Sequence, residues 1–233
     1  MKVYSRKMKN LNIESEHSQE RPIKLRIEYS PQLEVTRIRN VIEKLDWYKE
    51  QGYVENSFLP HGIRREKIRD LTEERIGEIV SEEYDEDLYK EVAARIWAEW
   101  EKFSENGLQN LSESGLELQS EYRIRLTKYG PSGSYNYPDL VVLRISEAGP
   151  ERTLKVIIHE IIHLAIQPYI EKHSVPHWKK ERLVDLIFQK ILPKLTTKQN
   201  IKEKVDDVDE SFDHYFPDIE KIAKVIGATN KSP

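Results

Sequence analysis

The chain has 233 residues, of which 38% are hydrophobic and 33% are charged, so it can bury a sizeable core beneath a heavily charged surface. The formal net charge of -4 argues against a nucleic-acid-binding protein, because such proteins usually carry an excess of basic residues. The absence of cysteine excludes disulfide bonds, thiolate metal ligands and a cysteine nucleophile.

The beginning of the chain is polar. Residues 1–21 carry charges without a following apolar run, so they are predicted to form a flexible N-terminal segment and not a signal peptide. No apolar run in the sequence approaches the length of a transmembrane helix. We therefore expect a cytoplasmic protein that has no membrane partner.

Residues 22–81 are predicted to form an N-terminal strand and two helices. Apolar and polar residues alternate over 23–29, which is the period of a half-buried strand. Apolar residues at helical spacing predict one helix over 35–51, ended by Gly52, and a second helix over 64–81.

Residues 82–195 are predicted to form the central unit of the protein. A helix over 85–103 carries one apolar stripe, which indicates a face packed on a core. Alternating patterns predict strands over 116–127 and 140–145, with a turn over 128–134 between them. A strongly apolar helix begins near residue 154 and is expected to break at Pro168.

A second apolar helix is predicted over 178–192, where Pro193 ends it. The remaining residues, 196–233, are predicted to contain a charged stretch, a short helix over 217–226 and a flexible tail.

The first apolar helix carries the pattern H-E-x-x-H as His159, Glu160 and His163. Residues four apart share one helix face, so the two imidazoles can hold one metal ion. Glu160 lies about 100° around the helix from His159, within reach of a metal-bound water. This is the pattern of zinc proteases, in which the glutamate is the general base. Polar side chains on an apolar helix are costly unless they have partners. The alternative interpretation is that the two are core histidines whose partners are carbonyl groups.

A catalytic zinc ion takes three protein ligands and keeps one position open. The helix over 178–192 carries Glu181 and Asp185 four residues apart on one face. We expect Glu181 to be the third ligand. We expect Asp185 to accept a hydrogen bond from the free ring nitrogen of a ligand histidine, most simply His159, which would fix its tautomer.

Alternatives remain for these positions. His177 opens the second helix and is the second candidate for the third ligand, or a hydrogen-bond donor to the transition state. His173 is a further candidate from the preceding loop. Glu181 could instead form an ion pair with Lys180 or Arg182 at an exposed edge of the helix.

The sequence His159-Glu160-x-x-His163 followed by Glu181-x-x-x-Asp185 resembles the gluzincin metallopeptidases, the thermolysin-like group. The resemblance covers about residues 153–192. It implies an α+β, zincin-like fold in which a small mixed β-sheet lies with an active-site helix and a backing helix, followed by a helical C-terminal subdomain. It also implies Zn2+ as cofactor and an edge strand, over 140–145, that binds an extended substrate beside the cleft.

The longer metzincin pattern, H-E-x-x-H-x-x-G-x-x-H, is absent. Ile166 stands at its glycine position and Tyr169 at its third histidine. The only methionines are Met1 and Met8, so there is no methionine turn either. These departures favour the branch that has a carboxylate as third ligand.

We therefore predict a zinc-dependent metallopeptidase that hydrolyses a peptide or protein substrate with a zinc-activated water and Glu160 as general base. A transition-state donor is also needed, and the candidates are Tyr129, Tyr135, Tyr137, His177 and His214. One alternative is a zincin-fold binding or regulatory protein with little proteolytic activity, and another is a closed structural metal site. A terminal segment could also block the cleft. The sequence does not indicate an oligomeric state.

Overall fold

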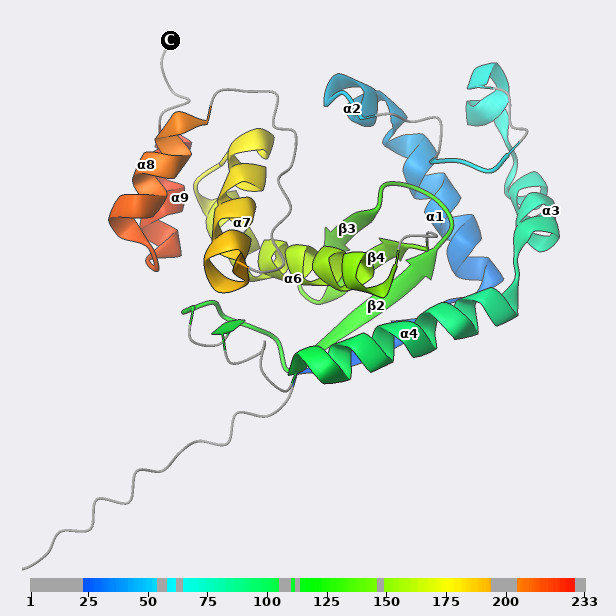
Figure 1. Ribbon diagram of the computed structural model, residues 1–233. Helices are drawn as coiled ribbons and strands as arrows, with labels where there is room; N and C mark the ends of the chain where they lie inside the picture. Colours follow the sequence, from blue (N-terminus) through cyan, green and yellow to red (C-terminus); the bar gives the residue numbers. More distant parts are fainter. Residues whose placement is uncertain are drawn as a thin grey trace, which may run out of the picture.

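The computed structural model describes residues 23–53, 58–61, 65–104, 110–111, 114–145, 149–193 and 205–228. The fold is α+β, with one small mixed sheet and helices on both of its faces (Figure 1). The predicted flexible segment 1–21 and most of the charged stretch after residue 195 lie outside the described residues.

The sheet has four strands in the order β1-β2-β4-β3, namely β1 (Lys24–Glu28), β2 (Glu121–Thr127), β4 (Leu140–Arg144) and β3 (Gly133–Asn136). The first three run parallel, and β3 runs antiparallel to β4. Strands β1, β2 and β4 confirm the three predicted strands.

The prediction of an edge strand over 140–145 is wrong. Strand β4 lies between β2 and β3, and four of its five residues are buried. The strand at that edge of the sheet is therefore β3. The sequence of β3, Gly-Ser-Tyr-Asn, has no apolar alternation and was predicted as part of a turn and the residues after it. Its pairing with β4 is what makes it a strand.

Each of the two long helices predicted in the first third of the chain is divided. Helix α1 (Pro31–Glu43) ends at Lys44, where the short α2 (Leu45–Glu50) begins. Ser30 caps α1, since its hydroxyl accepts a hydrogen bond from the Leu33 amide at 3.2 Å. A 3-10 helix (Arg65–Asp70) precedes α3 (Glu73–Glu83), and Thr72 caps α3 in the same way, which separates the two.

The central helices are α4 (Glu86–Ser104), α6 (Pro150–Lys172) and α7 (His177–Ile191). The prediction that Pro168 breaks the first apolar helix is wrong, because α6 continues through it to Lys172. Proline removes one backbone hydrogen bond, and its ring crowds the preceding turn. The buried side chains of Ile166 and Ile170 on either side hold this turn against the core.

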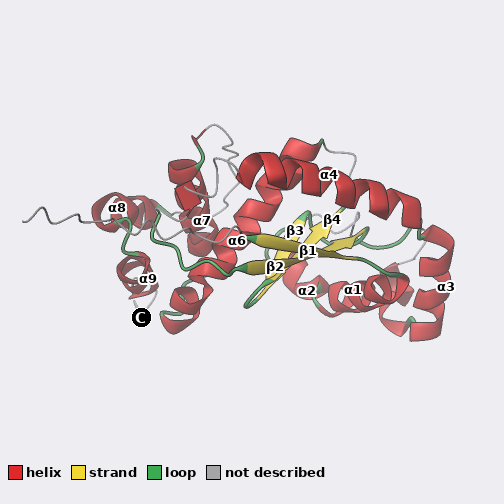
Figure 2. Ribbon diagram, turned by 90° about the horizontal axis from the view of Figure 1, so that it is seen from below, coloured by secondary structure: helices red, strands yellow, loops and turns green. Residues whose placement is uncertain are grey.

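Helix α4 lies along one face of the sheet and α1 to α3 lie below the other face in Figure 2, while α6 packs against α4, β3 and β4. Helix α8 (Asp206–Tyr215) was not predicted, whereas α9 (Ile219–Ala228) confirms the short C-terminal helix. Both pack into the same core as the sheet and α6. No helix among the described residues combines the length and apolar character needed to cross a lipid bilayer.

Candidate metal centre

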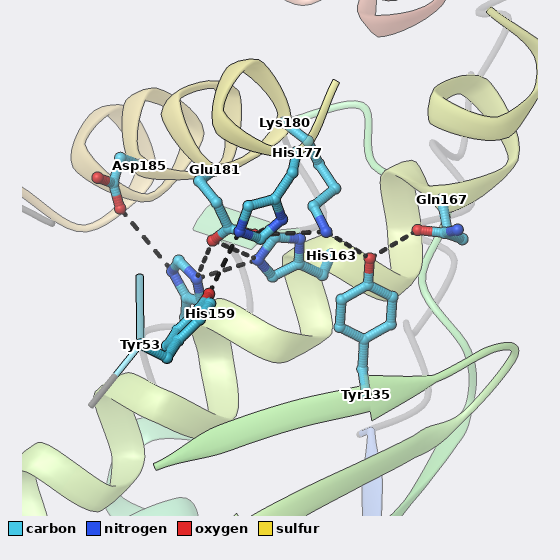
Figure 3. A network of polar contacts seen from close by, with 9 residues as sticks. All are labelled: Tyr53, Tyr135, His159, His163, Gln167, His177, Lys180, Glu181 and Asp185. Carbon is cyan, nitrogen blue, oxygen red and sulfur yellow. Dashed lines mark hydrogen bonds and ion pairs between the residues drawn. The ribbon is translucent and has the colours of Figure 1, made fainter. Parts of the chain in front are cut away.

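Helix α6 presents one polar stripe on an otherwise buried surface. Ile157, Ile158, Ile161 and Ile162 are at most 1% exposed, so the helix face that they share is held by apolar contacts. His159 and His163 face the side on which α7 crosses, and Glu181 points back at them from α7 (Figure 3). The four isoleucines lie within about 140° of one another around α6, so they bury one face and leave the histidine side for a polar partner.

Three ligand atoms converge between these helices. His159 Nε2 lies 3.1 Å from His163 Nε2, and Glu181 Oε2 lies 3.6 Å from the first nitrogen and 3.3 Å from the second. Ligands around a tetrahedral zinc ion with bonds of about 2.0–2.1 Å lie about 3.4 Å from one another. The spacing and the donor set therefore fit a metal ion, and His159, His163 and Glu181 form a group that could hold one.

The charges in this group favour metal binding. Burial disfavours the Glu181 carboxylate, but the His159 imidazole and the Lys180 ammonium group outweigh burial and hold its pKa well below the usual range. Burial lowers the pKa of His163 to about 4, so its imidazole is neutral and can offer a lone pair. Burial also opposes protonation of His159, yet Glu181 and the nearby carboxylates raise its pKa above the ordinary value.

Glu160 lies in a buried position beside His159, His163 and Glu181, which we call the triad. Its side chain is 7% exposed, and burial, together with the negative charge of Glu181, raises its pKa to about 7. Strand β3 covers it: a Cβ atom on Gly133 would overlap both the Glu160 carboxylate and a methyl group of Val156. Only glycine lets the strand approach this closely, so Gly133 sets the position of the Glu160 carboxylate.

The remaining ring nitrogens of the two histidines differ. His159 Nδ1 faces Asp185 Oδ1 at 3.9 Å, which is the direction predicted for a supporting carboxylate, although the distance exceeds that of a hydrogen bond. His163 Nδ1 is buried and has no hydrogen-bond partner among the described residues. The His163 ring instead stacks on Tyr135, with centroids 4.8 Å apart.

Lys180 connects Glu181 to the edge strand. Its Nζ lies 3.3 Å from Glu181 Oε1 and donates to the Tyr135 hydroxyl at 3.2 Å, and that hydroxyl donates to Gln167 Oε1 at 2.7 Å. The alternative ion pair between Glu181 and Lys180 is thus present, but it is buried and involves Oε1, whereas His159 and His163 contact Oε2. Arg182 pairs with Asp209 instead.

His177 lies at the rim of the triad. Its Nδ1 is 3.6 Å from Glu181 Oε1, and its Nε2 lies 3.3 Å from the hydroxyl of Tyr53. The converging group contains Glu181 and not His177. His173 lies near Glu220, with its Nε2 3.9 Å from that carboxylate.

The predicted transition-state donors separate into two sets. Tyr135 and His177 line the cleft at the triad. Tyr129 is bonded to Glu83, Tyr137 is 56% exposed, and neither these two nor His214 lines the cleft.

The triad opens onto a cleft of about 1040 Å³. Its lining comes from β3 with the turn before it, from α6 and α7, and from Trp47 of α2 and Tyr53 in the turn that follows. The described residues that line it are Lys44, Trp47, Tyr53, Phe58, Pro131, Ser132, Gly133, Ser134, Tyr135, Arg144, Arg152, Lys155, Val156, His159, Glu160, His163, His177, Lys180 and Glu181.

Sequence reasoning missed Tyr53 and Gly133. Tyr53 is a single aromatic residue after a helix-ending glycine, and nothing in the sequence indicates that it faces His177. Gly133 had a usable signal, because a glycine near a strand often marks a close backbone approach.

No family model, curated protein or solved structure matches this chain. The chemistry of the site therefore has to be argued from its own geometry.

Proposed function

We propose that this protein is a zinc-dependent metallopeptidase with a gluzincin-like active site on a zincin-like fold. The observation that carries the proposal is the convergence of two imidazole nitrogens and one carboxylate oxygen, 3.1–3.6 Å apart, beside a second buried carboxylate in an open cleft. Two histidines, one glutamate and an open side are the composition of a catalytic zinc site, whereas structural zinc sites are closed.

In this proposal His159, His163 and Glu181 hold the metal. When bound, a zinc ion polarises the carbonyl group of the scissile bond and lowers the pKa of a water molecule towards about 7. Glu160 accepts the proton of the attacking water and passes it to the leaving amine.

Strand β3 is suited to hold an extended peptide beside this site. The Arg144 amide donates to the Ser132 carbonyl at 3.0 Å, which makes these residues a hydrogen-bonded pair in the antiparallel ladder. Such pairs alternate along a strand, so the backbone groups of Gly133 and Tyr135 are directed to the outer edge of the sheet, where the cleft lies. A substrate added there as a further strand would cross the metal centre.

Two side chains at the site can act as hydrogen-bond donors. Tyr53 and His177 lie side by side, with the Tyr53 hydroxyl 3.3 Å from His177 Nε2. Burial raises the pKa of Tyr53, and the nearby Glu181 and Glu160 raise it further, so its hydroxyl keeps its proton at neutral pH. Either side chain can donate to a developing oxyanion.

The test compares metal content and peptide hydrolysis in the wild-type protein and in Glu160→Gln. We expect both proteins to bind one zinc ion per chain, and we expect Glu160→Gln to lose hydrolysis by about 100-fold or more. Glu78→Gln, an exposed glutamate on α3, is the matched control and should behave as wild type.

Wild-type hydrolysis by Glu160→Gln would contradict the assigned base. A wild-type protein that binds zinc and cleaves no peptide would favour the alternative, a zincin-fold binding or regulatory protein.

A further inference from the structure

The side chains that line the cleft carry a positive charge excess, although the whole chain is acidic. The chain has 41 acidic and 37 basic residues. The cleft is lined by five basic side chains, and its two acidic residues, Glu160 and Glu181, both belong to the metal centre. Among the described residues that line the cleft outside the metal centre, every charged side chain is therefore basic.

Three of these cations gather at one end of the cleft, which we call the basic end: Arg144, Arg152 and Lys155. Arg152 and Lys155 stand on the first turns of α6, and Arg144 closes β4 beside Ser132. Arg152 precedes His159 by seven residues, which is close to two full helical turns, so both share one face of α6. At 1.5 Å per residue the two lie about 10 Å apart along the helix.

Geometry and charge both indicate that the basic end is arranged for an anion. Burial lowers the pKa of the Arg144 guanidinium, and the positive charge of Arg152 lowers it further, so these two cations are close enough to repel each other. Lys155 lies 2.9 Å from Glu151, whose side chain is 68% exposed and stands outside the cleft lining. A bound anion would relieve the repulsion between like charges.

Carboxylate is the anion that a peptide carries. An extended peptide advances about 3.3 Å per residue, so 10 Å corresponds to about three residues along the edge of β3. Arginine binds carboxylates in a two-pronged geometry, which gives both affinity and a fixed position.

We infer that the substrate is an acidic peptide, held with a carboxylate group against Arg144, Arg152 and Lys155, about three residues from the scissile bond. This inference rests on the proposed peptidase function and names its substrate class. The carboxylate belongs either to an aspartate or glutamate side chain or to the C-terminus of the peptide, since both present the same group.

The experiment measures binding separately from cleavage. Zinc-loaded Glu160→Gln protein is titrated with fluorescein-labelled nonapeptides of alanine, glycine and serine that carry two glutamates, two glutamines or two lysines, all with amidated C-termini. We expect the glutamate peptide to bind about 3- to 10-fold more tightly than the glutamine peptide, and the lysine peptide to bind most weakly. The preference should weaken in 0.5 M salt, which screens charges beyond about 4–5 Å.

Adding Arg152→Gln should remove most of the preference for the glutamate peptide. Adding Arg75→Gln, which deletes the same charge from an exposed position on α3, should leave the preference intact. A preference that survives Arg152→Gln, or no preference in the starting protein, overturns the inference. A glutamine peptide with a free C-terminus that matches the glutamate peptide assigns the site to the terminal carboxylate.

Cleavage by the wild-type protein is then read from a peptide mixture by mass spectrometry. Enrichment of acidic residues about three positions from the cleaved bond supports the inference, and cleavage without such enrichment overturns it while the proposed function stands. An acidic binding preference without any cleavage would support the charge recognition and contradict the proposed function. Failure of every peptide to bind would overturn both.

Discussion

Two buried clusters of polar side chains lie on opposite faces of strand β3, and their hydrogen bonding is opposite in character. On one face Gly133 touches Glu160 of the metal centre. On the other face the Ser134 hydroxyl accepts a hydrogen bond from Arg37 of α1 at 3.3 Å. We call the second group the Glu34 cluster, and it consists of Glu34, Arg37, Tyr89, Thr127 and the backbone of residues 128–129.

In the Glu34 cluster each hydrogen bond joins a clear donor to a clear acceptor. The Glu34 carboxylate accepts from the Tyr89 hydroxyl, from the Thr127 hydroxyl at 2.6 Å and from the Lys128 amide at 2.8 Å. Arg37 Nε donates to the Tyr129 carbonyl at 3.2 Å. A buried network that is satisfied in this way stabilises the fold and fixes the strands it joins.

In the metal centre the three converging atoms are all able to act as acceptors. Two imidazole nitrogens and a carboxylate oxygen point at a common point, and His163 Nδ1 has no partner among the described residues. Such an arrangement is costly until a cation occupies it. The difference between the clusters supports the proposed metal site in one and a structural role for the other, so mutations in each should have separable effects.

The largest separation is expected from Glu181→Ala. Removing the carboxylate should weaken zinc affinity by more than about 100-fold, because loss of residues that merely orient a ligand already costs 10–100-fold. Zinc affinity is measured by competition with a chromophoric chelator, with Glu34→Ala as the control from the other cluster. Full zinc occupancy in Glu181→Ala would point to His177 as the third ligand.

The reciprocal effect is expected from Glu34→Ala. The change leaves the Lys128 amide and the hydroxyl groups of Tyr89 and Thr127 without their buried acceptor, so the free energy of unfolding should fall by about 3 kcal/mol. Chemical denaturation measures this loss, and the folded fraction should still bind zinc stoichiometrically. A lower zinc affinity with unchanged stability would show that the two clusters do not have separate roles.

Gly133→Ala tests the strand between the clusters. The new methyl group overlaps the Glu160 carboxylate, so hydrolysis should fall by about 100-fold and the free energy of unfolding by about 1–3 kcal/mol. Gly77→Ala is the matched control. Gly77 lies in helix α3, and outside the helix's own backbone no atom lies within 4 Å of the added methyl group. That control should raise the free energy of unfolding by up to about 1 kcal/mol. Unchanged hydrolysis in Gly133→Ala would mean that β3 does not position Glu160.

The smallest effect concerns pH. Burial raises the pKa of Glu34 above its ordinary value of 4.5, against the opposing hydrogen bonds from Thr127, Tyr89 and Lys128. The folded chain therefore binds this proton more tightly than the unfolded chain, and the resulting stabilisation is present below pH 4.5 and is lost as the pH rises through the folded-state pKa.

Unfolding free energies of wild-type protein and Glu34→Gln, measured from pH 4.5 to 7.5, should show this loss in the wild type only. Its slope cannot exceed about 1.4 kcal/mol per pH unit, the limit for one proton. A difference between the two proteins that grows in favour of the wild type with rising pH would contradict the raised pKa.

Sequence periodicity accounted for the elements whose residues are close neighbours along the chain. It predicted strands β1, β2 and β4 and the placing of His159 and His163 on one helix. It also predicted that Glu181 and Asp185 share one face of the next helix. It failed where a short element has no apolar period, as in β3, and where a capping residue such as Thr72 divides one amphipathic stretch into two helices.

What the sequence alone determined about this protein is the donor set on α6 and α7, because a helix with 3.6 residues per turn fixes which side chains share a face. Tertiary structure decided that the two faces meet, that β3 and not β4 is the edge, and that Gly133 admits β3 to Glu160. It also brought Tyr53 and three cations to the cleft. These contacts join residues as far apart as Arg37 and Ser134, and no local period encodes them, since they depend on how separate elements pack.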